Sequence, residues 1–375
     1  MIQLDRIVLR EIRLPLREPF RISSGELRER RIILCELFAA DGTTAWSECV
    51  VDDAPNYSSE TIDTAWPMIV RFLAPRLLGN EIEMPGEVHD ILEHDIRGHL
   101  MAKAALEMGC WAIESVRSGI PLARLIGGTR DRIATGISLG IQRDVHALIA
   151  KASESLAAGY QKVKIKIGPG RDVDWIRAVR TAVGDDAHLM ADANNAYTLA
   201  DVDRLAALDD LGLMMIEQPL AHDDLVRHAE LQRRLRTPIC LDESITSLDR
   251  AQDMVTLGAG RIINIKPGRV GGFSQAIAIH DYCESVGVPV WCGGMLESGI
   301  GRAYNVALAS LPGFTLPGDL SPSARYWVQD IVTPEWSMDK EGMVNVPLSK
   351  PGIGVEVDRA RIEQLTVRTE ELRAR

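Results

Sequence analysis

Short apolar segments recur at an almost constant interval through the later two thirds of this 375-residue chain. Starting from Lys166, the ionisable residues near the ends of successive segments are 26, 25, 25 and 24 positions apart. Apolar segments that alternate with helical stretches indicate parallel βα units, and a fixed interval of this size is typical of a barrel. Eight strands are predicted, at residues 133–141, 162–167, 189–194, 213–219, 239–244, 262–267, 288–294 and 314–320.

The region before residue 130 has a different pattern. Its first 50 residues contain β-rich runs and the hairpin signal Asp41-Gly42, which predict antiparallel strands. Two polar segments, residues 17–28 and 52–59, are predicted to be loops. Helices are expected at residues 61–78, 85–92 and 101–116, the first of them capped by Ser58 or Ser59 with Glu60 in its first turn.

Ionisable residues fall at the carboxyl ends of five consecutive predicted strands. In a barrel these ends meet at one mouth, where active sites are built. Any single acid there could instead cap a helix, but matching positions on three strands favour a shared site. The five residues are Lys166, Asp192, Glu217, Asp242 and Lys266.

Three carboxylates brought together in this way need a cation to remain ionised. Oxygen ligands without His or Cys favour a hard ion, so we expect Mg²⁺, with Mn²⁺ as a possible substitute. Asp192, Glu217 and Asp242 are the predicted ligands.

Two lysines are expected on opposite sides of this carboxylate arc. In KVKIK, Lys164 and Lys166 lie on one face of a strand, an arrangement that by itself would also suit a solvated edge strand. Lys266 would lie across the mouth from Lys166, and a lysine near a metal and another cation has a lowered pKa. Such a pair suits abstraction and return of a proton α to a carboxylate, through a metal-stabilised enediolate. The reaction class is racemisation, epimerisation or β-elimination.

Composition excludes several other functions. The formal charge of −11 disfavours nucleic acid as a partner. No stretch approaches the ~18 apolar residues of a membrane span, and the N-terminus lacks the apolar core of a signal peptide. The six cysteines have no metal-binding or disulfide spacing. We therefore expect a cytoplasmic protein with reduced cysteines and a small-molecule carboxylate partner.

The KVKIK motif, the three strand-end acids and the segment INIKPGRVGG (263–272) together resemble the muconate-lactonizing-enzyme subgroup of the enolase superfamily. The resemblance spans nearly the whole chain. It implies an α/β fold: a (β/α)7β TIM-like barrel with an α+β capping domain formed by the N-terminal third and the C-terminal tail. The implied segments are 1–130, 131–328 and 329–375, the last ending in a short surface helix. Homo-oligomers, either dimers or octamers, are expected from the same resemblance.

The resemblance also implies roles for individual residues. Lys166 and Lys266 would be the acid/base pair, with Lys164 beside Lys166. The residues expected to contact the metal ligands are Asn194 and Glu243. Those expected to contact or enclose the substrate are Ser138, Arg269, Gly294, Met295, Phe20 and Tyr57.

Within the superfamily, several segments are most similar to o-succinylbenzoate synthases that also racemise N-succinylamino acids. They include APNYSSE (54–60) and FTLPGDLSPSARYW (314–327), and Arg269 resembles a position of the racemase-capable branch. A lyase, an isomerase or an enzyme with both activities is expected, acting on a succinyl-bearing substrate.

Three alternatives remain open. A muconate cycloisomerase would have the same lysines and ligands. A dipeptide epimerase typically has an acid pair at the eighth strand, which residues 318–321 lack. An inactive metabolite-binding barrel would be expected to lose a ligand or a lysine, and none is lost here.

Overall fold

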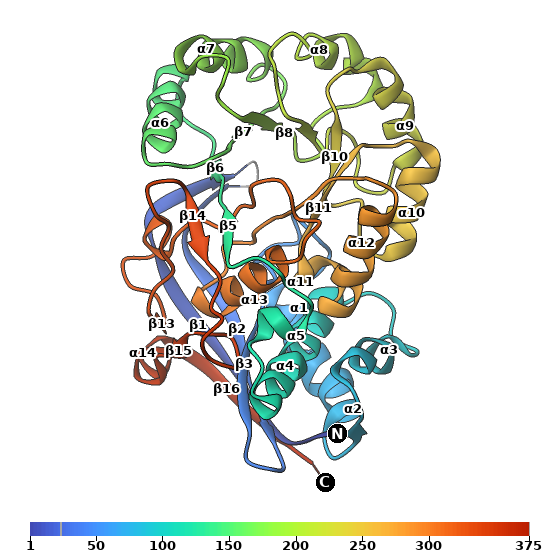
Figure 1. Cartoon of the computed structure of the whole chain (residues 1–375), viewed down its shortest axis with the longest axis vertical. Helices are drawn as coiled ribbons and strands as arrows, with labels where there is room; N and C mark the ends of the chain where they lie inside the picture. The colour runs from blue at the N-terminus through green and yellow to red at the C-terminus, as the bar shows by residue number, and fades with distance from the viewer. Residues whose placement is uncertain (23–24, 375) are drawn as a thin grey trace.

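The computed structural model describes residues 1–22 and 25–374, and the side chains of residues 20–26 are left out of the description. Figure 1 shows two parts, a ring of strands surrounded by helices and a second part built around long antiparallel strands. The two termini lie close together at the end of the molecule distant from the ring.

The ring contains a curled parallel sheet of seven strands among the described residues, in the order β12-β11-β10-β9-β8-β7-β6. Most of the strands are short and fully buried, as expected when helices cover the outer face. The strands are β6 (Ile137–Leu139), β7 (Val163–Lys166), β8 (Leu189–Asp192), β9 (Ile216–Glu217), β10 (Ile239–Leu241), β11 (Ile262–Ile265) and β12 (Val290–Cys292). The helices between and after them are α6 (Val145–Ala157), α7 (Val173–Val183), α8 (Val202–Ala206), α9 (Leu225–Arg234), α10 (Leu248–Leu257), α11 (Pro267–Val270), α12 (Phe273–Ser285) and α13 (Gly299–Ala309).

The eighth predicted strand, residues 314–320, is not a regular strand. It closes the ring through isolated parallel bridges, Phe314 to Val290 on one side and Gly318 to Thr135 on the other. Pro317 has no amide hydrogen to donate, which interrupts the ladder between these bridges. The barrel is therefore closed, but by an irregular segment instead of the regular eighth strand that the sequence predicts.

The first predicted strand, residues 133–141, is also two elements. Its beginning, β5 (Arg132–Ala134), pairs with β14 (Met343–Asn345) of the C-terminal segment, and only β6 belongs to the barrel sheet. Gly136 lies between them, where an added Cβ would come within 2.6 Å of Lys162 Cε. The change of partner therefore occurs where the backbone passes directly against Lys162.

The N-terminal part is an antiparallel sheet in the order β16-β1-β2-β3, with β4 (Glu81–Ile82) also pairing with β1. The segment 17–28 is not a plain loop, because β1 (Ile2–Ile22) and β2 (Gly25–Ala39), after a register shift beyond Pro15, resume their pairing from Phe20 to Ile22. Phe20 is part of this hairpin, but its side chain lies outside the described residues. The remaining strands are β3 (Thr44–Cys49) and β16 (Thr366–Arg373).

Helices pack against this sheet, with one correction to the predicted caps. Thr61, not Ser58 or Ser59, caps the first helix through reciprocal hydrogen bonds with Thr64. The Glu60 carboxylate instead accepts from the amides of Met101 and Ala102 at the start of α4, at 2.9 and 3.1 Å. The helices are α1 (Ile62–Met68), which continues through a π-helical turn into α2 (Ala74–Leu77), then α3 (Val88–Glu93), α4 (Leu100–Ser118) and α5 (Leu122–Leu125).

The C-terminal tail returns to the first sheet. After β13 (Val332–Thr333), β14 and β15 (Glu356–Val357), helix α14 (Arg359–Leu365) leads into β16. The final residues were expected to be a surface helix, but most of them form the edge strand that pairs with β1. Their alternating charged side chains suit a strand with a solvated face.

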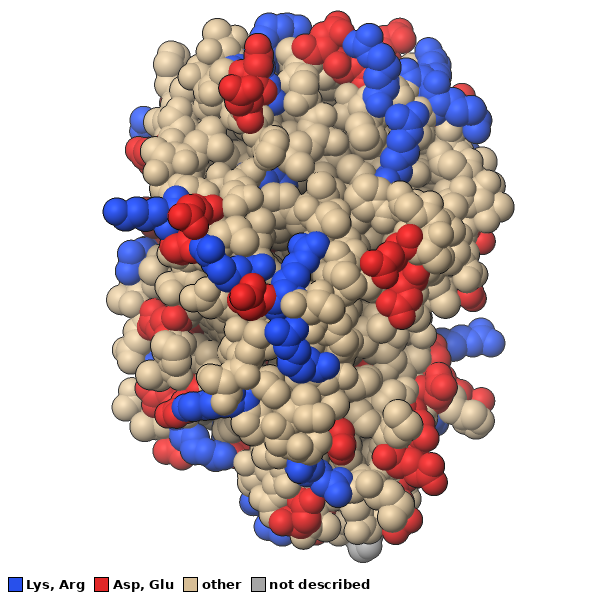
Figure 2. All heavy atoms as spheres, in the orientation of Figure 1, with Lys and Arg blue, Asp and Glu red and all other residues tan. Residues whose placement is uncertain are grey.

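Charges of both signs are interspersed over the face shown in Figure 2, and neither sign dominates it. Within residues 1–22 and 25–374, no helix is long and apolar enough to cross a membrane.

Glu48 of β3 joins the two parts of the molecule. Its buried carboxylate accepts hydrogen bonds from Ser298 Oγ at 2.5 Å and from the amide of Gly301 at 3.0 Å, at the start of α13. An added Cβ at Gly301 would lie 2.8 Å from the same carboxylate, so this close approach requires glycine.

Glu48→Ala is expected to lower the free energy of unfolding by about 2–4 kcal/mol, because it leaves several buried donors without an acceptor. Urea unfolding followed by circular dichroism measures this loss. The exposed Glu363→Ala is the control and should change stability by less than about 0.5 kcal/mol. Equal stability of the two variants would show that the Glu48 contacts do not hold the two parts together.

Candidate active site

Strand alternation directs one set of side chains into the barrel. Met190, Met215, Cys240, Ile262 and Trp291 form a separate buried apolar cluster. Asp192, Glu217 and Asp242 lie two positions after Met190, Met215 and Cys240, respectively. Each acid therefore lies on the same face of its strand as the apolar residue before it. The apolar cluster thus lies below the carboxylates in the barrel interior, and the carboxylates lie at the strand ends.

Lys166 lies at the end of β7 beside the end of β8. Its Nζ is 2.6 Å from Asp192 Oδ2 and 2.5 Å from Asn194 Oδ1. Asn194 has a positive φ of 41° and Asn195 one of 65°, so the chain turns sharply after β8. Asn194 Nδ2 also lies 3.3 Å from Glu243 Oε1. The predicted base is therefore fixed by an acid and an amide from the next strand.

Lys164 is more deeply buried and lies among three carboxylates. Its Nζ is 2.7 Å from Asp319 Oδ2, 3.2 Å from Glu217 Oε2 and 3.5 Å from Asp192 Oδ2. Glu217 is itself fully buried and accepts from Asn264 Nδ2 at 2.8 Å. The structure thus brings Lys164 close to two of the three predicted metal ligands.

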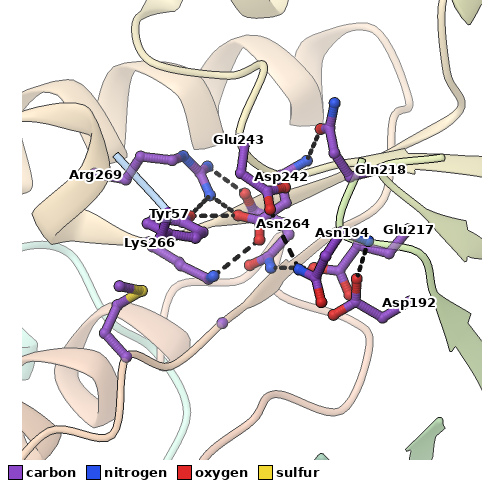
Figure 3. Close-up of polar contacts among 12 residues, drawn as sticks. Tyr57, Asp192, Asn194, Glu217, Gln218, Asp242, Glu243, Asn264, Lys266 and Arg269 are labelled. Carbon is purple, nitrogen blue, oxygen red and sulfur yellow. Dashed lines mark hydrogen bonds and ion pairs between the residues drawn. The ribbon is translucent and has the colours of Figure 1, made fainter. Parts of the chain in front are cut away.

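Asp242 is the acceptor for three groups from different parts of the chain (Figure 3). Lys266 Nζ lies 2.8 Å from Oδ2, the hydroxyl of Tyr57 donates to Oδ1 at 2.8 Å, and Arg269 also pairs with Oδ1. Tyr57 was expected to be an apolar lid residue. Its ring does cover Lys266, at 4.3 Å from Nζ, but its hydroxyl makes a polar contact with a predicted ligand.

Burial and mutual repulsion perturb the carboxylates. Burial, reinforced by the charges of Asp192 and Asp242, raises the pKa of Glu217 to about 8. Burial, with the same two charges, raises the pKa of Glu243 to about 7. The pKa of Asp242 is lowered, because Lys266 and Arg269 outweigh the opposing effect of burial. These carboxylates are close enough together to repel one another.

Neighbouring carboxylates raise the pKa of Lys266 and that of Lys164, whereas the sequence prediction of a lowered pKa concerns a lysine that also lies near a metal. Burial alone would lower the pKa of Lys266, but the attraction of Asp242 outweighs it and the pKa is raised. The pKa of Lys164 is likewise raised, because Asp319 and Glu217 outweigh burial. Both shifts follow from direct pairing of the ammonium groups with carboxylates.

The donor set fits a hard divalent cation. It consists of buried carboxylates, two of which, Asp192 and Asp242, raise the pKa of the third, Glu217, and such a group is stabilised by a positive ion between its members. Among the described residues, however, no three acidic, histidine or cysteine side chains already form a ligand cluster. The carboxylates are paired with cationic side chains instead: Lys164 with Asp192 and Glu217, Lys166 with Asp192, and Lys266 and Arg269 with Asp242.

A cavity of about 170 Å³ opens onto these groups. Four of the predicted substrate-contacting residues line it, whereas Arg269, which pairs with Asp242, is not in the lining. Arg30 crosses from β2 to donate to the carbonyl of Met295 at 3.1 Å, which ties the N-terminal part to the cavity wall. The four residues are Tyr57, Ser138, Gly294 and Met295.

Several residues of the site were not predicted. Asn264 lies two positions before Lys266, and Lys162 lies two positions before Lys164. Strand alternation therefore directs both side chains inward and could have identified them. Gln218 accepts from the amide of Asp242 at 3.0 Å with its side-chain oxygen and has a positive φ, which the sequence does not reveal. Asp319 lies within the irregular closing segment, so the inward direction of its side chain could not be inferred from strand alternation.

Comparisons with known proteins agree with this fold. Residues 5–127 match the mandelate racemase/muconate lactonizing enzyme N-terminal domain, and residues 147–361 match the enolase C-terminal domain-like family. The chain therefore belongs to the mandelate racemase/muconate lactonizing enzyme family of the enolase superfamily.

Particular relatives cover almost the whole chain. An o-succinylbenzoate synthase of Geobacillus kaustophilus is 50% identical over 97% of this chain and 96% of its own. An N-succinylamino acid racemase of Amycolatopsis is 45% identical over 97% of this chain and 98% of its own. A crystal structure of an enolase superfamily member from Listeria innocua superposes with a TM-score of 0.96 at 39% identity, covering 100% of both chains. The chain is thus closely related to a lyase and an isomerase, as expected from its sequence.

Proposed function

We propose that this protein is a Mg²⁺-dependent enzyme that removes the proton α to a substrate carboxylate. One possible reaction is dehydration of 2-succinyl-6-hydroxy-2,4-cyclohexadiene-1-carboxylate to o-succinylbenzoate, a step of menaquinone synthesis. The other is racemisation of N-succinylamino acids, and the protein would catalyse one of these reactions or both. The relatives named for these two reactions support the choice. The single observation that carries the proposal is the placement of Lys166 and Lys266, which line one cavity from strands separated by β8, β9 and β10.

Asp192, Glu217 and Asp242 would hold the cation. When bound, Mg²⁺ supplies positive charge to the substrate carboxylate and so stabilises the enediolate. Pairing of the carboxylates with a cation also weakens their attraction for Lys166 and Lys266, which favours a neutral amine. Mn²⁺ could serve in its place.

The lysines perform the proton transfers. In racemisation, one neutral lysine takes the α-proton and the other, as an ammonium, delivers a proton to the opposite face of the same carbon. In dehydration, Lys166 takes the α-proton and, as the resulting ammonium, returns it to the departing hydroxyl group, which leaves as water, while Lys266 stabilises the negative charge. Tyr57 and the hairpin residue Leu27 line the cavity and help to exclude water from these steps.

Assays with both substrates test the proposal. The purified protein with Mg²⁺ should racemise N-succinylphenylalanine, convert the dehydration substrate, or do both, and a chelator should stop each reaction. Absence of both reactions over a series of N-succinylamino acids would contradict it. A dipeptide epimerase is less well supported, because Asp319 is already paired with Lys162 and Lys164 and Ser321 replaces the second acid. We further expect a cytoplasmic homo-oligomer, a dimer or an octamer, which light scattering can identify.

Arg269→Gln is expected to reduce racemisation at least about ten-fold more than dehydration. Arg269 holds Asp242 and Tyr57 around Lys266, and racemisation requires Lys266 to transfer a proton, whereas dehydration requires only its charge. The ratio of the two kcat/KM values measures the effect. Arg261→Gln, an exposed change on the preceding loop, should leave the ratio unaltered, and equal losses in Arg269→Gln would refute this role.

A further inference from the structure

A buried chain of three charges lies beneath the site. Asp319 Oδ2 is 2.7 Å from Lys164 Nζ, and Asp319 Oδ1 is 3.3 Å from Lys162 Nζ. Lys162 is fully buried and the other two are at most 6% exposed. Asp319 therefore lies between two lysines that enter the barrel from β7 and from the residue just before it.

The Lys162 side chain is enclosed by its neighbours. Its Nζ lies 3.5 Å from the centroid of the Trp291 ring, and Lys164 Nζ lies 5.0 Å from the same centroid. On its other side is Gly136, where an added Cβ would contact Lys162 Cε. The Lys162 side chain thus fills a space bounded by an indole and a glycine, and its only ion-pair partner among the described residues is Asp319.

Lys164 can pair with two kinds of carboxylate. Glu217 and Asp192, at 3.2 and 3.5 Å, are proposed cation ligands, whereas Asp319, at 2.7 Å, is not. An ammonium that settled on Glu217 or Asp192 would compete with a divalent cation for the same oxygens. Asp319 is the nearest of the three acids, and its other carboxylate oxygen lies 3.3 Å from Lys162 Nζ.

We propose that Asp319, fixed by Lys162, is a positioning residue that draws the Lys164 ammonium away from Glu217 and Asp192 and so leaves these ligands available to the cation. This inference rests on the proposed cation site. It gives a function to a barrel-interior lysine and to the acid of the closing segment, neither of which takes part in the proposed proton transfers.

Calorimetric titration of the full-length protein with Mg²⁺ alone, without substrate, tests the inference. Asp319→Asn should weaken Mg²⁺ binding about 10–100-fold, the range found for residues that orient metal ligands. Loss of one negative charge would by itself weaken binding, so two charge-matched double variants are needed. One combines Asp319→Asn with Lys164→Met, the other combines it with Lys162→Met, and the methionines preserve most of the buried volume.

The two double variants separate positioning from charge. Removal of Lys164 removes the competitor, so the first double variant should regain affinity close to that of the unaltered protein. Removal of Lys162 leaves Lys164 in place, so the second should remain as weak as Asp319→Asn. Equal recovery in both would show that only net charge matters, and recovery in neither would show that Lys164 does not compete. Either result would overturn the inference.

Two further outcomes are distinct. Unchanged affinity in Asp319→Asn overturns the positioning role alone. Absence of Mg²⁺ binding by the unaltered protein overturns the proposed cation site and this inference together. Circular dichroism spectra of all variants verify folding, and Glu107→Gln, which removes a buried carboxylate that contacts α12 instead of the lysines, should bind Mg²⁺ normally.

Discussion

Lys166→Ala and Lys266→Ala are each expected to reduce racemisation by at least about 10²–10⁴-fold, the contribution of a positioned acid or base. The two lysines lie on opposite walls of one cavity, so each can reach only one face of the substrate carbon. Each variant should therefore still exchange the α-proton of one enantiomer, and the two variants should prefer opposite enantiomers. Exchange in heavy water, followed by mass spectrometry for each enantiomer separately, measures this preference.

Binding of Mg²⁺ should not weaken in either lysine variant, because the change removes a cation that pairs with Asp192 or Asp242. Lys350→Ala, which alters an exposed lysine paired with Glu356, is the control and should retain full activity. Racemisation at a normal rate in either active-site variant would remove that lysine from the mechanism.

Asp242→Asn is expected to have two effects, one on the cation and one on stability. It removes a proposed ligand, so the Kd for Mg²⁺ should rise by at least about 10–100-fold. It also leaves Lys266 and Arg269 as buried cations without their shared counter-charge, which should lower the free energy of unfolding by about 3–5 kcal/mol. Calorimetric titration and urea unfolding in the absence of Mg²⁺ measure the two effects separately.

The matched control is Asp253→Asn, a change at an exposed acid that pairs only loosely with Arg250. It should leave both Mg²⁺ affinity and stability unaltered. Unchanged Mg²⁺ affinity in Asp242→Asn would contradict its role as a ligand, whatever the effect on stability.

The central barrel could be predicted from sequence because its positions follow a local rule. Side chains alternate along each strand, and the strands recur at a regular interval. These two rules were enough to assign five residues to one barrel mouth from the sequence alone: Lys166, Asp192, Glu217, Asp242 and Lys266. The structure places all five within one network of contacts. The family and the capping domain were also recognisable from the sequence.

The elements that were missed depend on pairing between distant residues. Strand β16 pairs with β1 across almost the whole chain, and its charged sequence gives no sign of this partner. The extended hairpin of β1 and β2 likewise depends on cross-strand pairing that the polar composition of residues 17–28 conceals. In the same way, Glu60 was assigned to its own helix, but its partners are amides of α4.

The missed parts of the site have the same origin. Asp319 contacts Lys162 and Lys164 only because the closing segment bridges β12 and the residues just before β6 in the folded barrel, one strand from β7. The raised pKa of Lys266 could not be anticipated either, because it follows from the short contact with Asp242. The sequence could predict which residues lie at the barrel mouth, but not which of their side chains form ion pairs with one another.

The most direct test of the proposed function is exchange of the α-proton of N-succinylphenylalanine in heavy water. With Mg²⁺ present, the protein should incorporate deuterium at the α-carbon of both enantiomers, and the double variant Lys166→Ala/Lys266→Ala should incorporate none. No incorporation by the unaltered protein, with this substrate, other N-succinylamino acids or the dehydration substrate, would contradict proton abstraction as its chemistry.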